Sequence, residues 1–419
     1  MGNITTLGVL IVLLVVLSTV EMKAATKNHE YCKELSRAVE DFCSYEAPKK
    51  YCPRMCKAGK TLKLKCGKNL HTPKKQGLIA DAVEFAIDMA AKFAAAAHTG
   101  KDFLHLVVNA VTGKKEKKAG KRTSGSKAGS KRVLNGEKAD QGEWPWHLTL
   151  RNYPNKTSKG ARWCEATILS ENFVLTTQHC FGDWIEGIVG HKNFTKAKQF
   201  KVIAGDYDTT KKEEFESEIQ VEELYHNPSY ESLVVNKSDN NGVWAVDKHD
   251  ITVMKLKTPI KLEDKNKEQV CIPKSSAHNQ WKDATCYSYG YGFTHEGLLA
   301  DYLQEVELPL VPLDKCNAPQ AYNNTVTDVN LCAGFYKRGK SVCNFDSGAS
   351  LVCNKNGDDA QWFQLGMVST GKLWVTDFSQ LFAGKPQTNM PCSKHDGDYG
   401  LFTDVVKNME WVLTTILEL

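Results

Sequence analysis

Short apolar stretches recur between turn-forming residues along the last two-thirds of the chain, from residue 133 onward. They occupy residues 147–150, 166–177, 200–204, 251–256, 304–311 and 362–368. This spacing is typical of an antiparallel all-β domain. Residues 405–417 differ, because their apolar positions follow a helical period and predict an amphipathic helix.

Upstream of this region the pattern is helical. Residues 77–98 place apolar side chains three and four positions apart, with charged side chains on a separate arc, which predicts a helix. That helix either packs within its own small domain or docks on a partner or a membrane surface. A shorter apolar stretch, residues 103–111, is expected to pack beside it.

The long apolar run near the N-terminus covers residues 7–20. It has the length of a signal-peptide core and is shorter than a typical membrane span. The small residues Ala24 and Ala25 follow it. We therefore expect a signal peptide over residues 1–25 and a secreted, extracellular protein. No Lys or Arg precedes the run, so a retained membrane anchor stays open as the alternative.

The composition fits a secreted globular chain. Its 419 residues, 42% of them hydrophobic, suffice for one large core or two domains. Behind a signal peptide, fourteen cysteines indicate disulfides before metal sites. Five of these cysteines lie in residues 26–75, a segment that is too small for a core of its own and needs covalent staples. Sequons for N-glycosylation occur at Asn155, Asn193, Asn236 and Asn323.

Residues 114–132 consist mainly of Lys, Arg, Gly and Ser, with Glu116 as the one acidic residue. This composition predicts an exposed linker. Its basic groups also suit a polyanion such as a sulfated glycan or an acidic membrane. The net charge of +5 is modest for this length, and no nucleic-acid partner is expected. The linker separates a cysteine-containing helical prosegment, residues 26–113, from the β domain, residues 133–419.

Three short segments together suggest catalysis. Residues 174–180 read VLTTQHC, residues 249–256 read HDITVMKL, and residues 343–353 read CNFDSGASLVC. They resemble the trypsin and chymotrypsin family of serine proteases, which carries His, Asp and Ser in this order. The resemblance covers roughly residues 133–419. It implies an all-β fold of two antiparallel six-stranded β-barrels with a C-terminal helix, here preceded by a small α-helical disulfide-containing domain.

The resemblance assigns a catalytic role to His179, Asp250 and Ser347 and implies a protein or peptide substrate, with no cofactor and no metal. A serine hydroxyl is a weak nucleophile at neutral pH and needs a base within hydrogen-bond reach. His179 would take the proton of Ser347 and later return it to the leaving amine, while Asp250 would fix the imidazole tautomer and stabilise its cation. The backbone N–H groups of Phe345 and Ser347 would form the oxyanion hole.

An activation site also follows from the resemblance. Arg132 precedes Val133, and cleavage between them would free an α-amino group that pairs with the buried Asp346. Ser341 falls at the base of the specificity pocket, with Gly371 and Gly400 on its walls. An uncharged base predicts an apolar preference, so activation after Arg132 requires a different, basic-specific protease.

The family pattern further implies four disulfides: Cys164–Cys180, Cys286–Cys353, Cys316–Cys332 and Cys343–Cys392. Cys271 is then left over in the β domain, and the N-terminal segment has an odd number of cysteines. We hypothesise that one N-terminal cysteine bridges to Cys271, so that the prosegment stays attached after cleavage.

Several positions depart from the family. Phe345 stands where the family has glycine, Glu165 and Ala166 replace a Gly-Gly pair, and Thr370 replaces a tryptophan. Residues 371–392 form a long insertion beside the pocket. These departures favour an alternative class, a catalytically weak or inactive serine protease homologue that binds a partner or assembles a cascade.

One further region was considered as a metal site. Residues 206–218 are acidic and correspond loosely to a calcium loop. We expect solvated carboxylates there and assign no metal.

Overall fold

The computed structural model describes residues 31–57, 63–68, 136–155, 157–182, 196–237, 242–262, 266–294, 299–337, 339–343, 345–355, 361–373 and 395–419. All of them belong to one compact unit made of Met1–His71 and Lys131–Leu419, whereas Thr72–Ser130 form a second unit. The predicted helix at 77–98, the stretch at 103–111, the leader and the basic linker lie outside the described residues. None of the described helices combines the length and apolar character needed to span a bilayer.

The first half of the β domain is a closed antiparallel barrel. Its strands follow the order β2-β3-β4-β9-β6-β5. They are β2 (His147–Asn152), β3 (Ala161–Ile168), β4 (Phe173–Thr176), β5 (Phe200–Ala204), β6 (Ser217–His226) and β9 (Thr252–Leu256). The branched residues Val174, Val202 and Val253 are fully buried inside it, which is where such side chains stabilise strands.

The second half is an eight-stranded antiparallel sheet with the order β1-β11-β10-β14-β15-β17-β13-β12. Its strands are β1 (Glu137–Lys138), β10 (Thr285–Gly290), β11 (Gln304–Glu307), β12 (Leu310–Val311), β13 (Asn330–Ala333), β14 (Ser350–Asn354), β15 (Phe363–Val368) and β17 (Gly400–Asp404). The chymotrypsin-like double-barrel architecture is thereby confirmed. The strand count differs, since the described strands close into a six-stranded barrel only in the first half.

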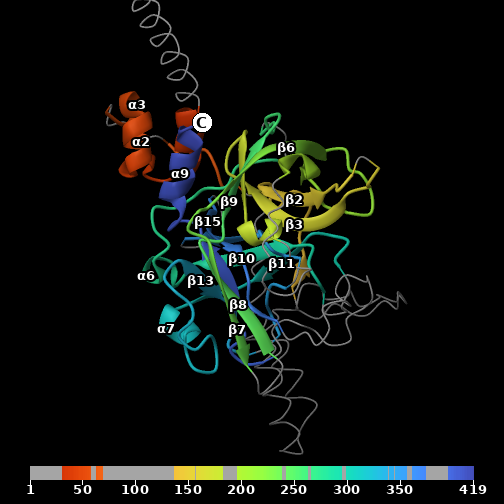
Figure 1. Ribbon diagram of the computed structural model, residues 1–419, viewed down its shortest axis with the longest axis vertical. Coiled ribbons are helices and arrows are strands. Elements are labelled where there is room, and N and C mark those ends of the chain that lie inside the picture. Colours follow the sequence, from red (N-terminus) through yellow and green to blue (C-terminus); the bar gives the residue numbers. More distant parts are fainter. Residues whose placement is uncertain are drawn as a thin grey trace, which may run out of the picture. The chain divides into compact units, whose positions relative to one another are not determined.

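A long hairpin lies between β6 and β9. Strands β7 (Glu231–Lys237) and β8 (Gly242–Lys248) pair along their whole length, and β8 also pairs with β16 (Lys372–Leu373) (Figure 1). The pattern of short apolar stretches did not predict this hairpin. It ends two residues before Asp250 and therefore reaches the candidate site.

Short helical turns connect the strands: η2 (Gln178–Phe181), η3 (Ala197–Gln199), α6 (His278–Trp281) and α7 (Leu313–Cys316). The last helix, α9 (Met409–Leu417), confirms the predicted amphipathic segment, with Met409, Val412, Leu413 and Ile416 buried.

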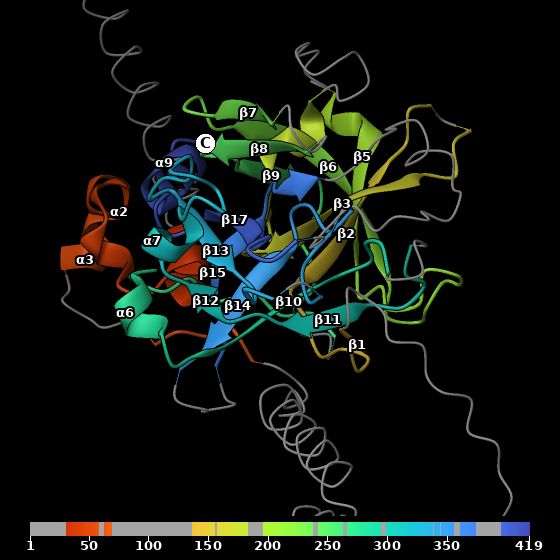
Figure 2. The ribbon, with the colours of Figure 1, turned by 90° about the horizontal axis from the view of Figure 1, so that it is seen from below.

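The N-terminal segment packs against the C-terminal helix α9 of the β domain. Residues 31–38 are helical, followed by η1 (Phe42–Ser44), α2 (Glu46–Tyr51) and α3 (Pro53–Lys57). Figures 1 and 2 show α2 and α3 beside α9. The Glu410 carboxylate of α9 accepts hydrogen bonds from the N–H groups of Glu46 (3.0 Å) and Ala47 (2.8 Å), which lie in the first turn of α2. A carboxylate at a helix N-terminus satisfies N–H groups that have no partner within the helix.

Three disulfides hold this segment. Cys32–Cys52 and Cys43–Cys56 staple it internally, and Cys66–Cys271 joins it to the β domain. Leu35 and Phe42 belong to the same buried cluster as residues of α9. The segment therefore shares one core with the domain that follows it, instead of folding as a separate helical domain.

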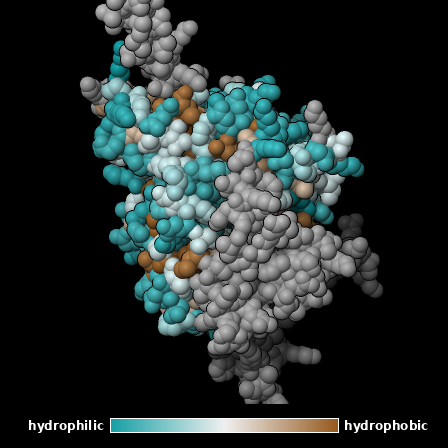
Figure 3. Space-filling model, in the orientation of Figure 1, coloured by the Kyte–Doolittle hydropathy of each residue, from teal (hydrophilic) through white to brown (hydrophobic). Residues whose placement is uncertain are grey.

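The surface of the described residues is mostly hydrophilic on the face shown in Figure 3. Across the described residues, the large hydrophobic side chains that are exposed are Phe215, Leu233, Leu313 and Tyr336. They come from separate segments, as is usual for a soluble surface.

Candidate active site

His179 and Asp250 meet between β4 and β9. His179 lies in the turn η2 directly after β4, and the Cys164–Cys180 disulfide ties this turn to β3. The Nδ1 atom of His179 is 2.7 Å from Oδ2 of Asp250, and its backbone N–H donates to Oδ1 at 2.9 Å. Two contacts to one carboxylate fix both the ring and the backbone of His179.

Asp250 is completely buried and has further partners. The Ser369 hydroxyl donates to Oδ2 at 2.5 Å, and the Thr403 hydroxyl donates to the Asp250 carbonyl at 3.0 Å. Burial opposes charge on both members of the pair, but their mutual attraction and hydrogen bonds outweigh it. On balance the pKa of Asp250 is lowered and the pKa of His179 is raised. The structure thus brings together His179, Asp250 and the supporting Ser369.

Ser347 lies in the turn before β14 and is half-buried. Its carbonyl accepts the N–H of Glu165 at 2.7 Å. The next residue, Gly348, has φ +85°, and a Cβ there would come within 2.1 Å of the Glu165 carbonyl oxygen and 2.6 Å of Thr176 Oγ1. Only glycine allows this approach. Because Thr176 is the last residue of β4, the contact holds the Ser347 turn against the strand that leads to His179.

Phe345 keeps a backbone conformation that glycine adopts without strain. Its φ is +72°, in the left-handed region. Its ring packs edge-on against Phe293, with centroids 5.4 Å apart. Among the described residues, neither the Phe345 N–H nor the Ser347 N–H has a hydrogen-bond acceptor. These two N–H groups belong to Ser347 itself and to the residue two positions before it.

Asp346 is buried beneath this turn. Its carboxylate accepts the N–H groups of Gly292 (2.8 Å) and Cys343 (2.9 Å). Burial raises the pKa of Asp346 to about 7, and the nearby Glu165 adds to the shift. Arg132 and Val133, the residues of the expected activation site, lie outside the described residues.

Glu165 and His147 form a buried pair beside Asp346 that the sequence analysis missed. Their Oε2 and Nε2 atoms are 3.0 Å apart, and both side chains are almost completely buried. The other carboxylate oxygen of Glu165 accepts the N–H of Tyr291 at 3.1 Å. Glu165 was recognised only as a replaced glycine, and nothing in the local sequence pointed to His147, which lies 18 positions earlier.

The residues of the expected specificity pocket are small or buried. Ser341 is buried, and a Cβ on Gly400 would come 3.1 Å from both Val342 and Phe402. Within the described part of the chain, a Cβ on Gly371 would meet only Tyr322 Oη, at 3.5 Å. Most of the insertion, from residue 374 to Cys392, lies outside the described residues.

A buried ion pair that the sequence did not reveal lies next to Gly371. Lys372 Nζ is 3.3 Å from Asp398 Oδ1, and both side chains are nearly inaccessible. In this pair each charge is opposed by the other, as buried charges require.

Disulfides are present at Cys164–Cys180, Cys286–Cys353 and Cys316–Cys332. Cys343 is also disulfide-bonded, while the partner expected for it, Cys392, lies outside the described residues.

Two of the four sequons can be located. Asn155 and Asn323 are exposed. Asn193 and the side chain of Asn236 are not described.

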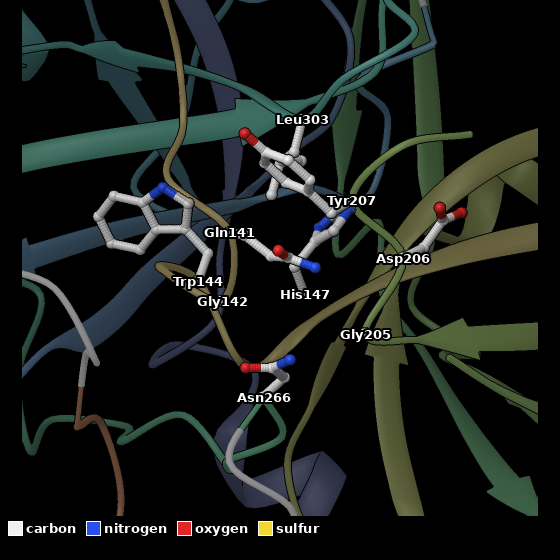
Figure 4. A pocket seen from close by; sticks show the side chains of 9 residues that line it. All are labelled: Gln141, Gly142, Trp144, His147, Gly205, Asp206, Tyr207, Asn266 and Leu303. Atoms are coloured by element: carbon white, nitrogen blue, oxygen red, sulfur yellow. The ribbon is translucent and has the colours of Figure 1, made fainter. Parts of the chain in front are cut away.

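The acidic region at residues 206–218 matches the expectation of solvated carboxylates only in part, since Glu214 and Glu218 are exposed. Asp206 and Asp208 are buried. The Asp206 carboxylate accepts the Thr149 hydroxyl at 3.2 Å, and burial raises its pKa to about 6. Asp206 and His147 help to line a small pocket of about 20 Å³ (Figure 4). That volume holds about one water molecule and is too small for a substrate side chain.

Comparisons with known proteins agree with this geometry. A sequence model of the Trypsin family matches residues 133–376. "Ovochymase" from Halocynthia roretzi is 27% identical over 285 residues, which cover 68% of this chain and 15% of that protein. The chain thus spans about one-seventh of the length of this relative, so the likeness concerns only that part of it.

Proposed function

Because the chain belongs to the trypsin family of serine proteases, we propose that it is a secreted serine endopeptidase made as a zymogen. The observation that carries the proposal is the hydrogen-bonded line from Ser369 through Asp250 to His179. Membership of the family gives the reaction class. The buried hydrogen bonds from Ser369 to Asp250 and between Asp250 and His179 hold the imidazole in place, as a catalytic base requires. The extracellular location is supported by the family and by the disulfides.

In the proposed mechanism, His179 removes the proton of the Ser347 hydroxyl as its oxygen attacks the scissile carbonyl carbon. Asp250 keeps Nδ1 protonated, so that Nε2 is the nitrogen that accepts the proton, and it stabilises the imidazolium. The N–H groups of Phe345 and Ser347 stabilise the negative oxygen of the tetrahedral intermediate. His179 then donates the proton to the leaving amine. These roles are carried over from the family to the matching positions of this chain.

We propose that a basic-specific protease activates the chain between Arg132 and Val133. The new α-ammonium group would pair with Asp346, whose buried carboxylate accepts hydrogen bonds only from backbone N–H groups in the described part of the chain. A buried carboxylate gains much from such a partner. Residues 1–25 would be the signal peptide and residues 26–113 a prosegment that the Cys66–Cys271 bond retains.

An apolar substrate preference is supported by Ser341, which offers no charge for Lys or Arg. The test uses the cleaved chain and peptides that differ only at the residue before the scissile bond. Phe or Leu should be preferred at least about tenfold over Arg, and Ser341→Asp should reverse the order because it adds a carboxylate at the pocket base. Preference of the unchanged protein for Arg or Lys would contradict this assignment.

The second candidate is a homologue that binds without cleaving. Phe345 and Thr370 favour it, because both replace residues that line the family's active site. The two candidates are separated by turnover of an apolar peptide ester by the cleaved chain, with Ser347→Ala as the matched control. Hydrolysis that depends on Ser347 supports the enzyme, and a rate equal to the control supports the binding protein.

Polyanion binding through residues 114–132 is proposed as a supplement to either function. Its basic residues would retain the chain on a heparin column in a salt-dependent way. Neutralising the lysines of this segment should remove the retention, whereas retention that is unchanged would place the binding elsewhere.

A further inference from the structure

A second carboxylate lies beside the His179–Asp250 pair. Asp247 is near the end of β8, three residues before Asp250, and its side chain is completely buried. Potential ligand atoms of His179, Asp247 and Asp250 all lie within 4.8 Å of one another. No other group of three such side chains is found in the described part of the chain. Asp247 therefore faces the imidazole from the hairpin that the sequence analysis did not foresee.

Two hydroxyl groups hold the Asp247 carboxylate. Ser232, its cross-strand partner on β7, donates to Oδ1 at 2.5 Å, and Tyr230 donates to Oδ2 at 3.1 Å. The Asp247 carbonyl accepts Nδ2 of Asn330 at 2.8 Å, which anchors the backbone to β13. The carboxylate is thus fixed in place on the side of its own hairpin.

His179 is the neighbour of Asp247 that can carry a positive charge. Within the described residues, no lysine or arginine lies within ion-pair distance of it. Burial and then the repulsion of Asp250 raise the pKa of Asp247 to about 6, while a protonated His179 acts in the opposite direction. Burial and both carboxylates also raise the pKa of Tyr230, so its hydroxyl remains a donor.

We propose that Asp247 is a positioning residue for His179, whose carboxylate joins that of Asp250 in stabilising the positive charge that the imidazole acquires during catalysis. This inference rests on the proposed function, since it assigns a part in the same reaction. Asp250 orients the ring through Nδ1, whereas Asp247 acts through space on the charge of the ring. Two carboxylates near one imidazole favour its protonated form more than one does.

Asp247→Asn tests the proposal because it removes the charge and keeps the shape. In the cleaved full chain, the acid limb of kcat/KM should move to lower pH by about one unit, a tenfold change in the proton affinity of His179. At pH 8.5, kcat should fall about tenfold with little change in KM, because the imidazolium forms only on the way to the transition state. A loss of rate without movement of the acid limb would show a merely structural role and overturn the proposal.

The matched control is Glu231→Gln, on the same hairpin. Glu231 is exposed and pairs with Lys248 at 3.0 Å, so its replacement should leave the pH profile unchanged. Folding of Asp247→Asn is checked by thermal unfolding. Since burial raises the pKa of Asp247 above its unfolded value, its ionisation costs stability above about pH 6. Asp247→Asn should therefore melt no lower than the unchanged protein at pH 8, and Asp247→Leu offers a second uncharged variant.

The pKa of His179 can also be measured without turnover. In ¹⁵N-histidine-labelled Ser347→Ala protein, an NMR titration should give a His179 pKa about one unit lower when Asp247→Asn is added. An unchanged pKa overturns the inference even in an active enzyme. If the shift is found and the protein hydrolyses no substrate, the proposed protease function fails while the electrostatic role of Asp247 stands.

Discussion

Replacing Phe345 with glycine decides whether this residue damages the oxyanion hole. The backbone at Phe345 has φ +72°, the region in which a glycine would sit without strain. The backbone of this turn therefore has the conformation that a glycine would adopt, although residue 345 carries a phenyl ring. If this is right, the Phe345 N–H is already in place, and Phe345→Gly gains little in the chemical step.

The effect on stability can be worked from the contacts. A left-handed backbone costs a residue with a side chain about 1–2 kcal/mol, which glycine would relieve. Against this, the edge-on contact with Phe293 contributes about 0.5–1.5 kcal/mol, and the freedom of glycine in the unfolded chain costs about 0.5–1 kcal/mol. These effects offset one another to within about 1 kcal/mol, so the melting temperature should change by only a few degrees.

The assay compares a small apolar peptide ester with a protein-sized substrate, using cleaved chain with and without Phe345→Gly. On the small ester, kcat should change by less than about tenfold. On the large substrate, kcat/KM should rise more, because the ring beside Phe293 no longer obstructs bulky groups. A rise in kcat of roughly a hundred- to a thousandfold on the small ester would show that the Phe345 N–H is misplaced, since one oxyanion-hole donor raises the rate by that factor.

Release of an α-ammonium at Val133 is expected to stabilise the fold most above pH 7. In the uncut chain, burial raises the pKa of Asp346 from 3.8 to about 7, so the stability that this carboxyl contributes is full below pH 3.8 and lost as the pH rises through 7. Cleavage should restore this stability at high pH. In Ser347→Ala protein, the difference in melting temperature between the cut and uncut forms should therefore be larger at pH 8 than at pH 5. Equal differences at the two pH values would contradict the proposed pairing of the α-ammonium group with Asp346. In a second test, the N-terminal segment should still co-elute with the cleaved domain when Cys66 and Cys271 are both changed to Ser, because the two parts share a core. Separation on gel filtration would show that the disulfide alone retains the segment.

The sequence was sufficient for the features that depend on local pattern or family motif. Short apolar stretches predicted the β domain, and the segments around His179, Asp250 and Ser347 indicated the family. The bridge to Cys271 followed from the count of cysteines. Each of these signals lies within one segment or one residue type, so no three-dimensional information was needed.

The features that were missed depend on contacts between distant segments. Glu165 and His147 pair across two strands, and the sequence marked Glu165 only as a replaced glycine and did not mark His147. Asp247 gains its importance from the hairpin that places it against His179, and the apolar pattern of the hairpin was not separated from the strands on either side. The docking of the N-terminal segment needs Glu410, which lies more than 360 residues away from its partners.

The most direct test of the central claim is covalent labelling of Ser347. Protein secreted from cells and cut at Arg132 is treated with a small serine-directed aryl phosphonate, and the label is located by peptide mass spectrometry. We expect labelling of Ser347 in the cut chain that disappears in His179→Ala and is strongly reduced in the uncut chain. No label on Ser347, in protein shown to be folded and cut, would contradict an operating triad and leave the binding protein as the function.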